Sequence, residues 1–166
     1  KETVFQTELA TAFRTCGWWV AKFPDAPISR MIASRDGAMR FSLPKPFDLI
    51  LCSPTGHFGA IECKLLRTDR WKLDDRAMRQ LDTLRGIASR PPALAAFAVN
   101  IRYRGTRKGI CNRAFLIRIG APGVSPPTEN WRTSLVIDMQ WLMAWSEEIP
   151  RITGGWNVRE LFPGGR

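Results

Sequence analysis

The chain has 166 residues, a length typical of one domain with a substantial hydrophobic core. Its 25 Lys and Arg residues against 15 Asp and Glu give a formal net charge of +10, which predicts a polyanionic partner. The sequence has no long apolar segment and no basic amphipathic helix, so it favours nucleic acid over a membrane surface as that partner.

The first predicted element is a helix over residues 3–16, followed by a strand over residues 18–22. Gly17 lies between them as a stop signal for the helix. Apolar residues recur through the helix at helical spacing, namely Val4, Phe5, Leu9, Ala12, Phe13 and Cys16. We expect this helix to pack against the sheet that contains the strand.

A long, proline-interrupted connection over residues 24–46 comes next. Segments of this kind in compact domains are usually functional loops or disordered. Its cations are predicted to contact phosphate groups, with an ordinary solvated loop as the alternative. These cations are Arg30, Arg35, Arg40 and Lys45.

The most informative segment is a predicted β-hairpin over residues 46–64. Two short runs rich in Ile, Leu and Phe flank a Ser-Pro-Thr-Gly turn. If the hairpin is symmetric about Thr55, Asp48 lies opposite Glu62, and Lys64 shares a face with Glu62. One face would then gather two carboxylates and one ammonium group.

Charges at alternate positions often mark the wet face of a half-exposed strand. Here the neighbouring runs Leu49-Ile50-Leu51 and Ala60-Ile61 are continuously apolar, so the strands are predicted to be covered on both faces. Buried charges are costly unless they are paired or bind a metal. Two close carboxylates of this kind suit Mg²⁺ or Mn²⁺, which would activate water, and Lys64 would position that water or offset charge on a phosphate.

Beyond the hairpin, cations and an aromatic residue precede a predicted helix over residues 74–86. Arg67, Arg70, Trp71 and Lys72 would grip a nucleic-acid backbone or form a plain loop. Asp74 is the predicted N-cap. Gln80 borders the apolar face of the helix, where it is either a surface residue or a functional one.

Two apolar strands are predicted around residues 94–101 and 113–119. The segment between them is predicted to be a basic loop that binds a nucleic-acid backbone. Its cations are Arg102, Arg104, Arg107 and Lys108.

Residues 121–166 are predicted to be a C-terminal extension of the same single domain. We expect a linker, a short strand near residues 135–137, and a helix over residues 139–145 whose Trp and Met side chains pack inward. The Trp residues of this extension are predicted to be core or dimer contacts, namely Trp141, Trp145 and Trp156.

The lone His57 and the cysteines do not form a metal or catalytic pattern. His57 falls in the hairpin turn, where we expect a solvated side chain. The cysteines lack paired spacing, which predicts reduced thiols and no zinc site, and they are Cys16, Cys52, Cys63 and Cys111.

Asp48, followed after a hairpin turn by Glu62-Cys63-Lys64, resembles the Asp…(Asp/Glu)-x-Lys signature of the PD-(D/E)XK nucleases. The surroundings, to about residue 120, resemble the Holliday junction resolvases of the archaeal and RecU types, including phage forms. The opening helix and strand, a helix with Gln80 after the Lys motif, and two apolar strands carry this likeness. It implies an α/β, restriction-endonuclease-like core, with a central mixed β-sheet flanked by helices.

The resemblance also implies an activity and a location. The protein would be a metal-dependent endonuclease that resolves four-way DNA junctions by paired symmetric nicks, acting as a homodimer in the cytoplasm of a bacterial or archaeal cell, or as a phage protein there. Asp48, Glu62 and the backbone carbonyl of Cys63 would hold Mg²⁺ or Mn²⁺. Lys64 would assist the attacking water, and Gln80 would orient water or phosphate.

Two further features follow from the same resemblance. Residues 24–46 would correspond to a stalk that reaches into the centre of the junction. A Glu on the first helix of the family completes the metal site, and a match without gaps places Gln6 there. Either an acid such as Glu2, one turn earlier, substitutes for it, or the position is an inactivating change. Glu2 and Glu8 otherwise fit solvated charges on the helix.

Two other functions remain open. Another repair or restriction-like nuclease of the superfamily would keep the chemistry of the hairpin but cut linear or flapped duplex. A non-catalytic, basic DNA-binding protein would explain the net charge and Gln6, although it leaves the buried Asp48, Glu62 and Lys64 without a purpose.

Overall fold

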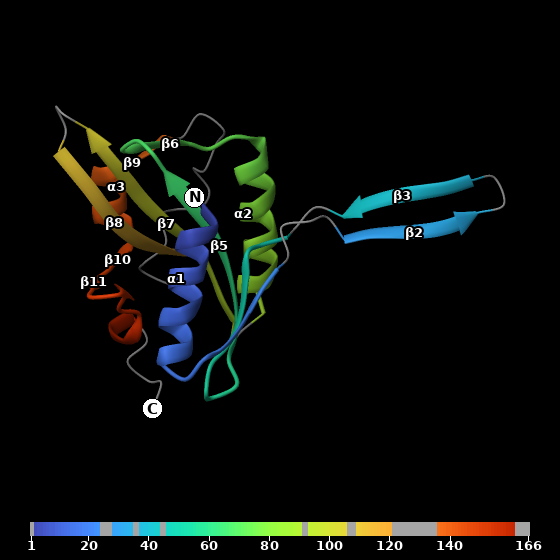
Figure 1. Ribbon diagram of the computed structural model, residues 1–166, viewed down its shortest axis with the longest axis horizontal. Helices are drawn as coiled ribbons and strands as arrows, with labels where there is room; N and C mark the ends of the chain where they lie inside the picture. Colours follow the sequence, from blue (N-terminus) through green and yellow to red (C-terminus); the bar gives the residue numbers. More distant parts are fainter. Residues whose placement is uncertain are drawn as a thin grey trace.

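The computed structural model describes residues 2–23, 28–34, 37–43, 46–90, 93–105, 109–120 and 136–161. A six-stranded mixed sheet forms its centre, in the order β1-β4-β5-β7-β8-β10 (Figure 1). Strands β5 and β7 are parallel and all other neighbours in this sheet are antiparallel. The strands are β1 (Trp19–Lys22), β4 (Leu49–Cys52), β5 (Phe58–Leu66), β7 (Ala93–Gly105), β8 (Gly109–Arg118) and β10 (Glu147–Ile149). The predicted central mixed sheet is confirmed.

Helix α1 (Glu2–Thr15) covers one face of this sheet and helix α2 (Asp75–Ala88) covers the other. Strand β5 shows why both are needed, because Ile61 packs into the core under α1 while its neighbour Ala60 packs into the core under α2. The prediction that the hairpin strands are covered on both faces is therefore confirmed.

The boundaries of α2 agree with the predicted capping at its start and differ at its end. Asp74 is the N-cap, and its Oδ1 accepts a hydrogen bond from the Ala77 N–H at 2.8 Å. The helix continues two residues past Gly86, because a single glycine is tolerated inside a helix. Ser89 then caps it, with its N–H donating to the Arg85 carbonyl at 3.0 Å.

The basic connection contains a β-hairpin of its own, formed by β2 (Ile28–Ser34) and β3 (Gly37–Leu43). It stands away from the body of the molecule (Figure 1). At its base, the Phe23 N–H donates to the Asp48 carbonyl at 2.9 Å, so the segment leaves the sheet and returns to it beside Asp48. Arg30 lies on β2 and Arg40 on β3, while Arg35 and Lys45 fall outside the described residues.

Strands β7 and β8 extend further than predicted. Their pairing continues to Gly105 opposite Gly109, which places Arg102 and Arg104 on β7 instead of in a loop. The long apolar pattern ends earlier than the strand because the last residues of β7 pair with β8 beyond the edge of the core. Arg107 and Lys108 lie outside the described residues.

After residue 135 the chain returns to the sheet. Strand β9 (Val136–Asp138) pairs with β6 (Arg70–Lys72), and α3 (Met139–Trp145) matches the predicted helix. The inward packing of its Trp and Met side chains was wrong in part, because Met143 is 62% and Trp145 43% exposed while Leu142 is the buried residue of this short helix. The remaining elements are β11 (Arg151–Ile152), β12 (Gly155–Trp156), which carries the buried Trp156, and the 3-10 helix η2 (Arg159–Leu161).

The other sequence features lie as follows. His57 is exposed in the hairpin turn, as predicted. All four cysteines are free thiols. In the described part of the chain, no helix has the length and the apolar character needed to cross a membrane.

Candidate active site

The β4–β5 hairpin has the predicted register. Leu49 pairs with Ile61 and Cys52 with Phe58, which makes the hairpin symmetric about Thr55. One rung beyond Leu49 this register places Asp48 across from Glu62. The two carboxylates therefore lie on the same face of the sheet, the face that α2 covers.

Asp48 lies just before the first residue of β4, and its side chain and backbone continue the hydrogen bonding to β5. Its Oδ2 accepts a hydrogen bond from the Cys63 N–H at 2.7 Å, and its own N–H donates to the Ile61 carbonyl at 3.0 Å. The N–H and C=O of one strand residue point to the same side, so the Cys63 carbonyl also points toward the edge at which Asp48 lies. Asp48 is 5% exposed, which makes this a buried carboxylate held by backbone.

Glu62, Lys64 and Gln80 form a hydrogen-bonded triangle between β5 and α2. The Lys64 Nζ donates to Glu62 Oε1 at 2.7 Å and to Gln80 Oε1 at 2.7 Å. The Gln80 Nε2 donates to the same Glu62 Oε1. Glu62 and Gln80 are 3% and 7% exposed, so Gln80 is a buried partner of both charged groups, and the packing of α2 on the sheet determines the position of all three.

Gln6 is buried in α1 at the level of Asp48. The neighbouring Thr7 accepts a hydrogen bond from Lys22 Nζ at 3.0 Å, and Lys22 pairs with Leu49, the residue after Asp48. Gln6 itself is 4% exposed, so its amide lies under the sheet and not in solvent. Gln6 therefore belongs to the α1 side of the sheet, whereas Glu62 and Lys64 bond to Gln80 on α2.

Glu8 is the acid on α1 whose side chain the structure describes. Glu8 accepts a hydrogen bond from the Trp156 indole at 3.0 Å and lies 3.8 Å from the Arg151 guanidinium, so it ties α1 to the C-terminal residues. The prediction of a solvated charge at Glu8 was wrong, because the C-terminal segment folds back onto α1. The Glu2 side chain falls outside the described residues.

The donor atoms fit a hard divalent cation only in part. Two carboxylates, a backbone carbonyl and an amide oxygen are the ligand types that Mg²⁺ and Mn²⁺ accept. Within the described ranges, no group of three or more His, Cys, Asp or Glu side chains is placed to hold a metal ion. Asp48, Glu62 and the Cys63 carbonyl match part of such a site, and a contribution from Gln6 stays a prediction.

Lys64 also lines a polar cleft of about 190 Å³ on the outer side of the triangle. Its other lining residues are Leu65, Leu66, Trp71, Asp74, Arg76 and Ala77. Sequence reasoning missed Arg76, although it lies four residues before Gln80 and therefore on the same side of α2.

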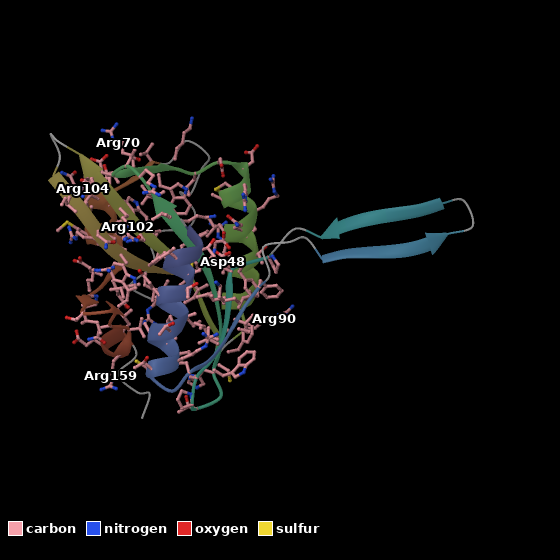
Figure 2. The ribbon with its side chains drawn as sticks, viewed as in Figure 1. Asp48, Arg70, Arg90, Arg102, Arg104 and Arg159 are labelled. Carbon is pink, nitrogen blue, oxygen red and sulfur yellow. The ribbon has the colours of Figure 1, made fainter. Side chains whose placement is uncertain are left out.

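Of the cations predicted to bind nucleic acid, the described ones outside β2 and β3 are exposed, except for the half-buried Arg102. Arg67, Lys72 and Arg104 are exposed, and Arg67 and Lys72 belong to the segment that follows β5. Figure 2 shows Arg70 and Arg104 at the same end of the molecule, where β5 finishes. The cations thus gather around the carboxyl end of the strand that carries Glu62 and Lys64.

Comparison with known proteins gives a likeness in structure but none in sequence. No protein-family model matches the chain, and no curated protein matches it. Among solved structures, the chain is similar to Hjc of Archaeoglobus fulgidus, a Holliday junction resolvase from an archaeal hyperthermophile. The match has a TM-score of 0.52 and 19% identity, and it covers 88% of this chain and 94% of Hjc.

The chain has the fold of this resolvase. The predicted restriction-endonuclease-like core is therefore confirmed. At this level of identity the likeness concerns the fold, and the roles of individual residues rest on their geometry.

Proposed function

We propose that the protein is a metal-dependent, structure-selective endonuclease that resolves four-way DNA junctions by paired symmetric nicks. The observation that supports this most is the placement of Asp48 and Glu62 on one rung, with Lys64 bonded to Glu62, inside the fold of a junction resolvase. Burying this polar group costs stability unless its charges are well paired or bind a metal, so we infer that the group serves a purpose other than stability. A catalytic site is the purpose that its composition fits best.

In this proposal, Asp48, Glu62 and the carbonyl of Cys63 hold Mg²⁺ or Mn²⁺. The metal, when bound, supplies an activated water and neutralises charge on the phosphate. Lys64 orients the attacking water, and Gln80 holds the side chains of Lys64 and Glu62 at their hydrogen-bonding distance. Gln6 occupies the place of a third carboxylate, and its neutral amide lowers the affinity for metal.

Branched DNA would lie across the α2 face, with the β2–β3 hairpin beside the reacting phosphate. The hairpin base at Phe23 and Asp48 supports this placement, because the segment leaves the body at the proposed metal site. A junction has near two-fold symmetry, so a homodimer would make the two nicks. The cations that would contact phosphates are Arg30, Arg35, Arg40, Lys45, Arg67, Lys72, Arg104, Arg107 and Lys108.

The test is cleavage of a labelled four-way junction in Mg²⁺ by this chain and by its Gln6→Glu variant, with linear duplex as a second substrate. We expect weak or no cleavage by the parent chain and paired symmetric nicks by the variant, with duplex uncut. Asp48→Asn in the Gln6→Glu background is the matched control and should abolish cutting.

Other outcomes would change the proposal in defined ways. Equal cleavage of duplex and junction would indicate a different nuclease of the same superfamily. If both proteins bind the junction but neither cuts it, with Mg²⁺ or with Mn²⁺, the enzyme assignment is wrong and a DNA-binding protein is the better one.

A further inference from the structure

A row of exposed side chains crosses the α2 face of the sheet at the end opposite to Arg104. Trp19 pairs with Cys52, and Cys52 pairs with Phe58, so the three lie side by side on β1, β4 and β5. Their neighbours Val20 and Leu51 pack into the core under α1, which turns the row toward the α2 side. Trp19 is 61% exposed and Phe58 42% exposed.

The row continues into a pocket of about 300 Å³ beside the last turn of α2. Its lining residues are Gly56, Phe58, Gly86, Ile87, Arg90 and Ala93. A Cβ added at Gly86 would meet no atom within 4 Å, so a larger side chain has room at this edge of the pocket. Arg90 lies beside this end of α2 (Figure 2), and among the lining residues none is acidic.

The pocket and the proposed catalytic residues share one face and the same strands. Asp48 precedes β4 and Cys52 ends it, four residues along the same extended chain. At roughly 3.3 Å per residue the aromatic row lies about 13 Å from Asp48 along the strand direction. A DNA strand that passes the catalytic carboxylates can therefore reach the row within a few nucleotides.

Exposed aromatic rings with a cation beside them bind unpaired bases, because every base offers a face for stacking and the cation attracts the phosphate next to it. A second copy of this chain is a weaker candidate for the occupant of this pocket, since Arg90 would lose its water against another basic chain, and the proposed homodimer would therefore use a different surface. We propose that Trp19, Phe58 and Arg90, together with the pocket at Gly86, form a binding site for unpaired nucleotides of branched DNA. The proposal takes DNA as the substrate from the proposed function but does not depend on cleavage.

The experiment measures the affinity of the full chain for an oligothymidine of about twelve nucleotides, and for a fully paired duplex, in EDTA. Trp19→Ala and Phe58→Ala are each expected to weaken oligothymidine binding about tenfold, which is the usual loss for one stacked base. Duplex binding should change by less than about twofold, because phosphate contacts dominate it. Gly86→Leu fills the pocket while keeping both rings, and should weaken oligothymidine binding as well.

Trp145→Ala is the matched control, because Trp145 on α3 is also an exposed tryptophan, at 43%, and lies away from the pocket. It should leave both affinities unchanged. The proposal is overturned if the Trp19, Phe58 and Gly86 variants bind oligothymidine like the parent, or if they lose duplex binding equally. It is also overturned if sedimentation shows that these variants lose self-association, which would make the row a contact between copies. Because no metal is present, a protein that never cuts junctions can still pass this test.

Discussion

The two faces of the central sheet are covered by helices of equal length, yet they are built differently. Under α1 the described core is mainly apolar, with Phe5, Leu9 and Phe13 packed on the strands, and the polar side chains of Gln6 and Asn100 buried on this side are neutral. Under α2 the apolar core is interrupted by a polar group that consists of the buried Asp48, Glu62 and Gln80 and the half-buried Lys64.

The apolar residues under α1 stabilise the fold, whereas the polar residues under α2 depend on the fold to hold them in place. Apolar burial contributes stability wherever it occurs, whereas buried charges recover their desolvation cost only through good pairing. Apolar packing on the α1 face thus stabilises the sheet. On the α2 face, the polar group lowers the stability of the fold, and its composition matches the catalytic site proposed above.

The largest expected effect is on the α1 face. Phe13 is fully buried, and its ring contacts Trp18 edge-on with centroids 5.4 Å apart. Phe13→Ala should lower the free energy of unfolding by about 3–5 kcal/mol, as measured by denaturant titration. Val4→Ala on the same helix, where Val4 is 45% exposed, is the control and should cost less than about 0.5 kcal/mol. Similar losses from both would show that α1 does not pack as described.

The second effect tests the charged pair on the α2 face. Lys64→Met leaves the Glu62 carboxylate buried without its ammonium partner, and should cost about 3 kcal/mol. The double variant Glu62→Leu with Lys64→Met should recover part of this loss, because apolar residues of similar volume replace both charges while the buried Gln80 amide loses both of these partners. A double variant that is less stable than Lys64→Met alone would mean that the pair itself stabilises the fold, and the contrast between the two faces would fail.

These expectations indicate which parts of the structure the sequence predicts. The hairpin register follows from the alternation of side chains and from the turn at Thr55, which are local properties, and both are confirmed. The buried position of Gln80 could not be derived, because it depends on how α2 rotates when it packs against β5. The helical spacing located its face, but no local signal distinguishes a buried Gln at the border of that face from a solvated one.

The C-terminal residues show the same limit more strongly. The helix over 139–145 was predicted from local pattern, whereas the contact of Trp156 with Glu8 joins residues far apart in the chain. Likewise, no short sequence motif predicts that β10 pairs with β8. Long-range pairings of this kind are set by the packing of the whole chain and not by the propensity of a segment.

The third effect concerns metal binding at the polar group. Mn²⁺ at about a hundredfold excess over its dissociation constant should stabilise the folded chain by about 2.7 kcal/mol, which raises the melting temperature. The shift at a fixed Mn²⁺ concentration should be larger for Gln6→Glu than for the parent chain, because the variant adds a carboxylate. Asp48→Asn should remove the shift, and an unchanged shift in that variant would place the metal elsewhere.

The smallest effect comes from a second ion pair between a cation and a glutamate, which lies on the solvent-exposed edge of the sheet. At the β8–β10 edge, Arg113 donates two hydrogen bonds to Glu148, at 2.8 and 2.6 Å, and the Glu148 side chain is 45% exposed. The hydrogen bond from Arg113 holds the pKa of the Glu148 carboxyl below its ordinary value, against the opposing effect of burial. Water screens such a pair, so its contribution to stability should be about 0.2–1 kcal/mol.

The pH dependence of that contribution has a definite sign. Because the folded pKa is lowered, the stabilisation is present above the ordinary glutamate pKa and is lost as the pH falls through the lowered value. Glu148→Gln should therefore be less stable than the parent chain near pH 7, and the difference should vanish in strong acid. Combining it with Arg113→Met in a double-mutant cycle isolates the pair from the contact of Arg113 with the Phe115 ring. A coupling energy at neutral pH as large as that between Lys64 and Glu62 would mean that burial does not distinguish the two ion pairs. A stability difference between Glu148→Gln and the parent chain that persists in acid would mean that the charge of Glu148 does not cause it.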